Sequence, residues 1–331
     1  MKKDMKMKKG KMILKIFLIV LAVLIVFTAA VYINHITLLK KEEALLAPLG
    51  QLAEVEGSKM SVYIEGQGNT TLVFMSGGGT CSPILDFRTL YSRLSDEYKI
   101  AVVEKFGYGY SDISDKERDI DTILEDTRAA LSKSGLTAPY VLCPHSMSGL
   151  EALYWAQKYP DEVTAIIGLD MAVPEYYDTM KINLPIIRIG GAAAEMGFTR
   201  LIPNISESDA IKHGTLTEEE KEIYRAVFYS RTATKSMINE CESVKANAMT
   251  VKNGEVPQLP VLLFISDGSG GTGFDKESWR KIPKDYISQV NDGEYIELDC
   301  PHYVHNYEYE KISDESKAFL DRICDMKGEQ E

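Results

Sequence analysis

The chain has 331 residues, of which 45% are hydrophobic and 26% charged, so it is long enough and apolar enough for one large folded core or two smaller ones. Its formal net charge is −12, and residues 42–331, which keep 28 of the 37 basic and 48 of the 49 acidic side chains, carry a net charge of −20. This excess of negative charge argues against nucleic acid as a partner.

The N-terminal segment differs in composition from the rest of the chain. Six lysines among residues 2–11 precede residues 16–33, which are 18 uncharged and mostly apolar residues. That length is close to what a helix needs to cross a bilayer, and the preceding lysines favour a cytoplasmic N-terminus. We therefore predict a cytoplasmic basic segment (residues 1–12) and a transmembrane anchor (residues 13–35) that places the rest of the chain outside the cell membrane. The small residues Thr28, Ala29 and Ala30 leave a cleaved signal peptide open as the alternative.

After the anchor, residues 36–51 are predicted to form a juxtamembrane helix and linker, followed by an alternating strand at residues 60–66. Short apolar segments then alternate with segments of helical periodicity. Strands are predicted at residues 71–75, 100–104, 140–143, 165–169 and 261–265, and helices at residues 83–94, 120–134, 148–159 and 312–323. This order is typical of a mostly parallel sheet covered by helices on both faces.

Residues 173–256 interrupt the alternation with about eighty residues of helical character. Such a segment is too long for a connecting loop, so we predict an inserted helical lid. The α/β core would then comprise residues 52–172 and 257–325.

Ser146 is the candidate nucleophile, because it stands in a sharp turn between a predicted strand and a predicted helix. Such turns usually read G-x-S-x-G, since the positions two residues before and after the serine are crowded. Here those positions hold Pro144 and Ser148, which are compact but are not glycine. Ser148 is the poorer candidate, because it would put the bulky Leu150 at a crowded position.

The glycine run at residues 76–80, SGGGT, also follows a predicted strand. Its backbone can approach a substrate closely, so the N–H groups of Gly78 and Met147 are the predicted oxyanion donors. We expect Gly77, Gly79 and His145, together with residues of the lid, to contact the substrate.

The segment YIELDCPHYVH (residues 295–305) places His302 just after a further, last strand and before the helix predicted at residues 312–323, so His302 is the candidate general base. Two aspartates could orient it. Asp267 and Asp170 each end a predicted strand, and both give the order Ser, Asp, His along the chain. Asp267 is the first choice and Asp170 the alternative.

With these features in place, residues 52–325 resemble the α/β-hydrolase superfamily, and within it the lidded esterases and proline-iminopeptidase-like enzymes. The resemblance rests on SGGGT, VVEKFGYGYSD (residues 102–112), PHSMSG, GLDMAVPEY and CPHYVHNYE, in this order along the chain. It implies the α/β-hydrolase fold, with Ser146 as nucleophile, His302 as base and Asp267 or Asp170 as the third member of a catalytic triad. The two elbow positions without glycine, and the absence of a G-x-x-D segment before Asp267, are departures from the family pattern.

The predicted function is that of a membrane-anchored serine hydrolase that cleaves a small or medium acyl ester, or an amide, through an acyl-enzyme. The alternatives are an N-terminal peptidase of the proline-iminopeptidase type, in which Glu195 or Glu222 would receive the free amine, and a non-catalytic ligand-binding module on the same fold. Neither a metal nor an organic cofactor is expected. The five cysteines have no metal-site spacing and are expected to be mainly free thiols.

Overall fold

The computed structural model describes residues 2–328, which contain one eight-stranded sheet in the order β1-β2-β4-β3-β5-β6-β7-β8. The first two strands form an antiparallel hairpin, and β2 also pairs antiparallel with β4; all other neighbours are parallel. The strands are β1 (Gln51–Val55), β2 (Ser58–Glu65), β3 (Thr71–Met75), β4 (Lys99–Glu104), β5 (Tyr140–Pro144), β6 (Val163–Leu169), β7 (Val261–Ile265) and β8 (Gly293–Glu297). The prediction of a mostly parallel sheet is confirmed.

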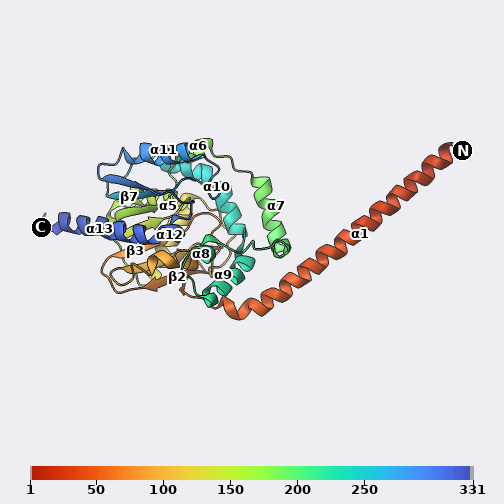
Figure 1. Ribbon diagram of the computed structural model, residues 1–331, viewed down its shortest axis with the longest axis horizontal. Coiled ribbons are helices and arrows are strands. Elements are labelled where there is room, and N and C mark those ends of the chain that lie inside the picture. The colour runs from red at the N-terminus through yellow and green to blue at the C-terminus, as the bar shows by residue number, and fades with distance from the viewer. Residues whose placement is uncertain (1, 329–331) are drawn as a thin grey trace.

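Helices cover both faces of this sheet (Figure 1). In the core they are α2 (Pro83–Asp86), α3 (Arg88–Tyr91), α4 (Ile120–Lys133), α5 (Ser148–Lys158), the 3₁₀ helix η2 (Pro160–Glu162), α11 (Lys276–Ile287), α12 (Val304–Tyr307) and α13 (Tyr309–Gly328). Between β6 and β7 the insertion contains α6 (Tyr176–Thr179), α7 (Leu184–Glu195), η3 (Phe198–Leu201), α8 (Asp209–Lys212), α9 (Glu218–Arg231) and α10 (Lys235–Lys252).

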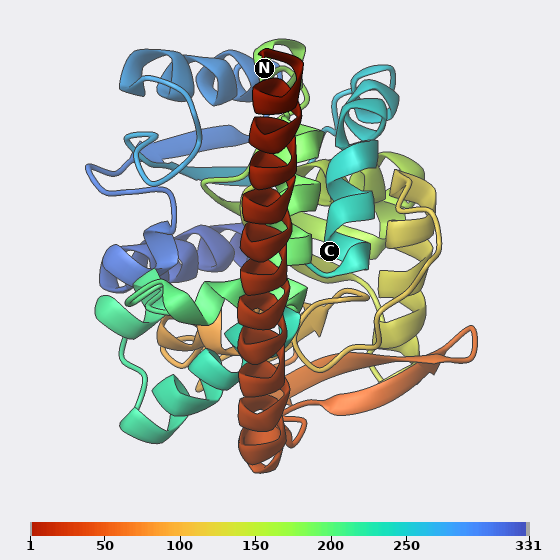
Figure 2. The ribbon, with the colours of Figure 1, turned by 90° about the vertical axis from the view of Figure 1, so that its right-hand side faces the viewer.

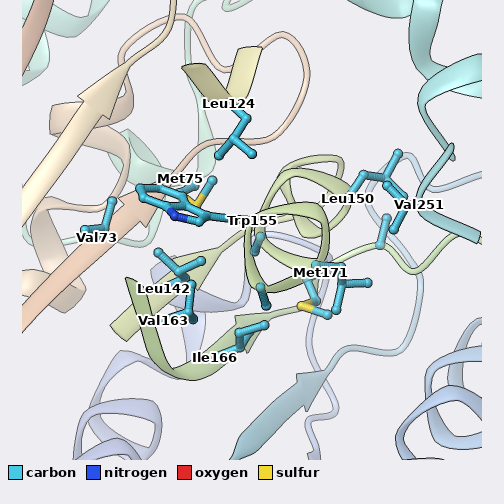
Figure 3. Close-up of a cluster of buried hydrophobic side chains, with 14 of the residues drawn as sticks. Val73, Met75, Leu124, Leu142, Leu150, Trp155, Val163, Ile166, Met171 and Val251 are labelled. Atoms are coloured by element: carbon cyan, nitrogen blue, oxygen red, sulfur yellow. The ribbon is translucent and has the colours of Figure 1, made fainter. Parts of the chain in front are cut away.

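Successive side chains of a strand point to opposite faces of a sheet, and this alternation divides the core in two. Val73 and Met75 of β3 belong to a cluster with Leu142 and with Trp155 of α5, as Figure 3 shows. Leu72 and Phe74 of the same strand belong to a second cluster, with side chains of α3 and α13. Because both faces of β3 are buried, the strand reads as a continuous apolar run.

Three elements differ from the sequence prediction. The helix predicted at residues 83–94 is divided at Phe87 into α2 and α3. The Phe87 N–H donates to the Pro83 carbonyl in the last turn of α2, and the Phe87 carbonyl accepts from the N–H groups of Leu90 and Tyr91 in α3. The juxtamembrane helix predicted within residues 36–51 is continuous with the preceding helix, which ends at Glu42, and it is followed by the 3₁₀ helix η1 (Glu43–Leu46). Strand β1 was not predicted, because only Ala53 and Val55 of its residues are buried.

The first helix, α1 (Lys2–Glu42), extends away from the α/β body, so that the N-terminus lies far from the sheet (Figure 1). It contains a window of mean hydropathy 3.1, which makes it long and apolar enough to cross a membrane. The described contacts of α1 with the body begin near residue 24 and continue to its C-terminal end, and Val31 and His35 are buried there.

Candidate active site

Ser146 lies at the corner between β5 and α5, above the carboxyl end of the sheet. Its φ of +54° is in the left-handed region, which non-glycine residues rarely adopt. Two N–H groups hold the corner, because the Ser146 carbonyl accepts from Gly149 (2.9 Å) and from Ala172 (2.7 Å). The predicted sharp turn is therefore present, and it raises the Ser146 hydroxyl above the sheet edge.

The residues that replace the elbow glycines have structural explanations. The Ser148 hydroxyl is buried and donates to the carbonyl of Met75 at the end of β3 (2.6 Å), so it ties the elbow to the neighbouring strand. The close backbone approach occurs one residue later, at Gly149, where a Cβ atom would lie 2.2 Å from the Ala172 carbonyl oxygen. Glycine is thus needed at position 149, and position 148 has room for a hydroxyl.

His302 completes a hydrogen-bonded relay with Ser146. Its Nε2 lies 2.8 Å from Ser146 Oγ, and its Nδ1 lies 2.5 Å from Asp170 Oδ2. Since the carboxylate can only accept at neutral pH, Nδ1 carries the proton, and Nε2 is left to accept from the Ser146 hydroxyl. The structure therefore brings together Ser146, His302 and the alternative aspartate.

Asp267, the first choice from the sequence, does not contact His302. Its Oδ1 accepts from the N–H of Ser269 (2.8 Å), which is a local turn contact. Its own N–H donates to the carbonyl of Cys300 (3.1 Å), so Asp267 pairs with the loop that carries His302 through its backbone and not through its carboxylate. The preference for Asp267 over Asp170 is corrected on this geometry.

Asp170 sits immediately after β6 with a φ of +51° and is 3% exposed. Its carboxylate accepts from the Ser266 N–H (2.7 Å), from the Ser266 hydroxyl (2.6 Å) and from Trp279 Nε1 (3.0 Å), in addition to His302. These donors fix both carboxylate oxygens, which orients the imidazole. Ser266 and Trp279 were not singled out in the sequence, where nothing marks them as neighbours of Asp170.

The glycine run lies against the nucleophile. A Cβ atom on Gly77 would lie 2.7 Å from Ser146 Cβ, so only glycine fits there. Within residues 2–328, neither the Gly78 N–H nor the Met147 N–H donates a hydrogen bond, so both are free for a substrate oxygen. The Gly79 N–H, by contrast, donates to the hydroxyl of Tyr108 (3.3 Å).

His145 is fully buried next to the relay, with its ring centroid 4.7 Å from that of His302. Burial, together with the neighbouring His302 and His305, holds the pKa of His145 well below its usual value, so its ring stays neutral. Its Nε2 lies 3.2 Å from the His302 carbonyl oxygen, which ties the elbow to the loop of the base. His145 also borders the cavity, as do Gly77 and Gly79.

A cavity of about 640 Å³ opens over Ser146 and is bounded on its far side by the insertion. Its walls are mostly apolar, and no Asp or Glu is among the described residues that line it. Besides the glycine run and the relay, the main lining side chains are Met147, Tyr177, Met180, Lys181, Ile182, Asn183, Ile187, Met237, Ile238, Cys241, Val244, Trp279 and Tyr303. The volume suits a small organic ligand.

Comparison with known proteins agrees with this architecture. Residues 70–185 match the sequence model of the alpha/beta hydrolase fold. The uncharacterised protein YbdG of Bacillus subtilis (strain 168) is 40% identical over 319 residues, which cover 94% of this chain and 98% of YbdG.

Solved structures with the same fold are more distant in sequence. The epoxide hydrolase VrEH1 from Vigna radiata is 18% identical, with a TM-score of 0.62. The aligned residues cover 82% of this chain and 97% of the VrEH1 chain. The enol-lactonase from Burkholderia xenovorans LB400 is also 18% identical, with a TM-score of 0.61 over 82% of this chain and 100% of its own. With the sheet order, the elbow and these matches in agreement, the chain belongs to the α/β hydrolase family.

Proposed function

We propose that this α/β hydrolase is a membrane-anchored serine esterase that acts through an acyl-enzyme on Ser146. The observation that carries the proposal is the relay of Ser146, His302 and Asp170, with hydrogen-bond distances of 2.8 and 2.5 Å. A serine whose proton can pass to a histidine, itself oriented by a buried carboxylate, is equipped for nucleophilic attack.

The proposed reaction has two halves. Ser146 Oγ attacks the ester carbonyl while His302 Nε2 takes its proton, and the N–H groups of Gly78 and Met147 receive the oxyanion. The tetrahedral intermediate collapses, and His302 returns the proton to the departing alcohol. A water molecule then gives its proton to His302 and attacks the acyl-enzyme, which releases the carboxylic acid and restores the Ser146 hydroxyl.

The walls of the cavity favour an ester over an N-terminal peptide. A peptidase that recognises a free amine needs a carboxylate near the scissile bond, and the described lining residues include none. Glu195 and Glu222, the two acidic residues considered for this role, are exposed and do not line the cavity. The substrate expected from these walls has no positive charge on its acyl group.

The apolar helix α1 supports anchoring in the cell membrane, with the N-terminal lysines in the cytoplasm and the catalytic domain outside. The helical insertion, which bounds the cavity opposite Ser146, is proposed to act as the lid that selects the substrate.

Fluorophosphonate labelling of the detergent-solubilised protein, with p-nitrophenyl butyrate turnover measured in parallel, tests the proposal. Ser146→Ala and His302→Ala should abolish labelling, and Asp170→Asn should lower kcat by about 10⁴-fold because the imidazole would take the wrong tautomer. Asp267→Asn is the matched control and should stay near the wild-type rate. A folded wild type that neither labels nor turns over the ester would favour the binding module, and a loss confined to Asp267→Asn would overturn the assignment of Asp170.

A further inference from the structure

Exposed apolar side chains gather on one part of the insertion. Ile186 and Ile189 of α7 are 64% and 70% exposed, the two largest values for bulky apolar residues after residue 42 in the described chain. Leu201 and Ile202, just beyond α7, are each 52% exposed. Monomeric soluble proteins rarely leave such a group of side chains in water, so this surface calls for a partner.

The same part of the insertion contacts the apolar stretch of α1. The ring of Phe198 lies 6.4 Å from that of Phe27. Met196 closes a hollow whose other walls are α1 side chains, namely Leu24, Ile25, Thr28, Ala29 and Tyr32. Figure 2 shows α1 in front of the α/β body, and Figure 1 shows α7 on the side of the body that faces α1.

A polar clamp fixes this arrangement at the end of the apolar stretch. Arg200 makes a bidentate contact with Glu42 (2.9 and 2.6 Å) and donates to His35 Nδ1 (2.9 Å). Its guanidinium also lies 4.0 Å from the ring centroid of Tyr229. Polar groups at residues 35–42 and apolar contacts at residues 24–32 are the order expected across a membrane surface.

The contact between Phe198 and Phe27 indicates how deep this part of the insertion would lie in a bilayer. At 1.5 Å per residue, Phe27 lies about 9 Å inward from Ile33, the last residue of the apolar stretch. If the apolar stretch spans the bilayer, Phe198 lies at a similar depth, and interfacial elements bury their apolar faces about 5–10 Å into the boundary of a bilayer. The bilayer itself is therefore the partner that covers Ile186 and Ile189.

We propose that α7 and the turn after it (residues 196–202) form a membrane-immersed entrance, through which an ester with a long apolar chain passes from the outer leaflet into the cavity of Ser146. Ile187 and Asn183 of the α7 region line the cavity, whereas Ile186 and Ile189 face outward, so one short helix separates the bilayer from the active site. The choice of substrate class rests on the proposed esterase function. The immersion of α7 does not.

Tryptophan quenching by brominated lipid tests the immersion without any turnover. In a Ser146→Ala background, the full chain carrying Ile189→Trp is reconstituted into phosphatidylcholine vesicles with bromine at the 6,7 positions of an acyl chain. Native Trp155 and Trp279 are buried (0% and 2% exposed) and give the background. Met249→Trp is the matched control, because Met249 is similarly exposed (54%) but lies on α10, outside the group.

The expected result is strong quenching at position 189 and none above background at position 249. Equal quenching at both positions overturns the proposal. An unquenched Ile189→Trp also overturns the proposal. If that protein cross-links as a dimer, a second copy covers the surface instead of the bilayer.

The substrate class is tested with two esters. The double variant Ile186→Asp/Ile189→Asp should lower kcat/KM for a monoacylglycerol in phosphatidylcholine vesicles by about tenfold, while water-soluble p-nitrophenyl butyrate changes by less than about twofold. Met249→Asp should change neither. An unchanged rate on the vesicle ester overturns the entrance. If the wild type hydrolyses neither ester and yet position 189 is quenched, the esterase function fails and the immersion is confirmed.

Discussion

Two residues of the relay, Ser146 and Asp170, have positive φ angles of 54° and 51° without being glycine. Such backbone conformations cost about 1–3 kcal/mol each and persist only where neighbouring groups enforce them. Here the Ser146 carbonyl accepts two hydrogen bonds, and the Asp170 N–H donates to the Phe264 carbonyl (2.8 Å). The backbone strain is thus located at the two residues that provide the nucleophilic hydroxyl and the carboxylate that orients His302.

Substitutions at positions 148 and 149 of the elbow should differ in how much stability and labelling they cost. Gly149→Ala brings a Cβ within 2.2 Å of the Ala172 carbonyl oxygen, so we expect loss of fluorophosphonate labelling and destabilisation by more than about 3 kcal/mol. Ser148→Gly loses a buried hydroxyl that bonds Met75 and should cost only about 1–2 kcal/mol, with labelling retained. Thermal unfolding of both variants in detergent measures the difference, and a Gly149→Ala variant as stable as Ser148→Gly would contradict it.

Glu104 gives the protein a specific dependence of stability on pH. Burial raises the pKa of its carboxyl to about 7, although the Tyr110 N–H donates to it. Because the unfolded group ionises near pH 4.5, folding takes up a proton between about pH 4.5 and 7. The stability that this carboxyl contributes is therefore present below that window and is lost as the pH rises through it, by roughly 3 kcal/mol.

Glu104→Gln should remove the contribution of this carboxyl to the dependence of stability on pH. The wild-type Tm should fall between pH 5.5 and pH 8 more than the Tm of the variant does, by a few degrees. The measurement is a pair of melting curves for each protein in the same detergent. Parallel shifts in the two proteins would show that Glu104 is not the group that titrates.

At the scale of elements, one buried ion network joins the core to the insertion. Lys105, at the end of β4, contacts Glu151 of α5 (2.6 Å) and Glu240 of α10, and all three side chains are less than 5% exposed. Tyr108 donates to Glu240 (2.8 Å) and accepts from the Gly79 N–H, so the network reaches the glycine run. The position of α10 and the shape of the cavity wall opposite Ser146 therefore depend on buried charges.

Lys105→Met should destabilise the protein by about 3–5 kcal/mol, because it leaves two buried carboxylates without their cation. Lys116→Met is a matched control. Lys116 pairs with Glu56 at the surface, where both side chains are at least 40% exposed, and its loss should cost no more than about 1 kcal/mol. Chemical denaturation of the two variants tests this, and equal costs would refute the role of the buried network.

The sequence predicted the central strands well, because β3, β5 and β7 are buried on both faces and are therefore continuously apolar. It missed β1, an edge strand with two buried residues, and it placed one helix where Phe87 ends α2 and begins α3. The sequence could not decide between Asp170 and Asp267, because both end a strand. They differ in their spatial neighbours, since Ser266, Trp279 and His302 all contact the carboxylate of Asp170.

At the scale of the whole molecule, the proposed topology places the two ends of the chain on opposite sides of the membrane. Cys324 is exposed on α13, whereas Cys81, Cys143 and Cys300 are buried and Cys241 is partly buried at the cavity. A membrane-impermeant maleimide added to intact cells should therefore label the wild type at Cys324 and should label Cys324→Ser far less.

Met7→Cys in the Cys324→Ser background provides the opposite test. Its thiol should react only after the cells are permeabilised, because the lysine-rich start of the chain is expected in the cytoplasm. Labelling of position 7 in intact cells, or protection of Cys324, would reverse the topology.

The clamp of Arg200 on Glu42 and His35 has a mechanical consequence. A transmembrane helix whose apolar length differs from the local hydrocarbon thickness adapts by changing its tilt or by deforming the bilayer, so in the proposed topology the tilt of α1 would depend on the thickness of the bilayer. Since α1 is held to the turn that follows α7, a change of tilt acts on the same segment that separates the cavity from the surroundings. Bilayers of different thickness should thus set different access to Ser146, which would make the protein responsive to the lipid composition around it.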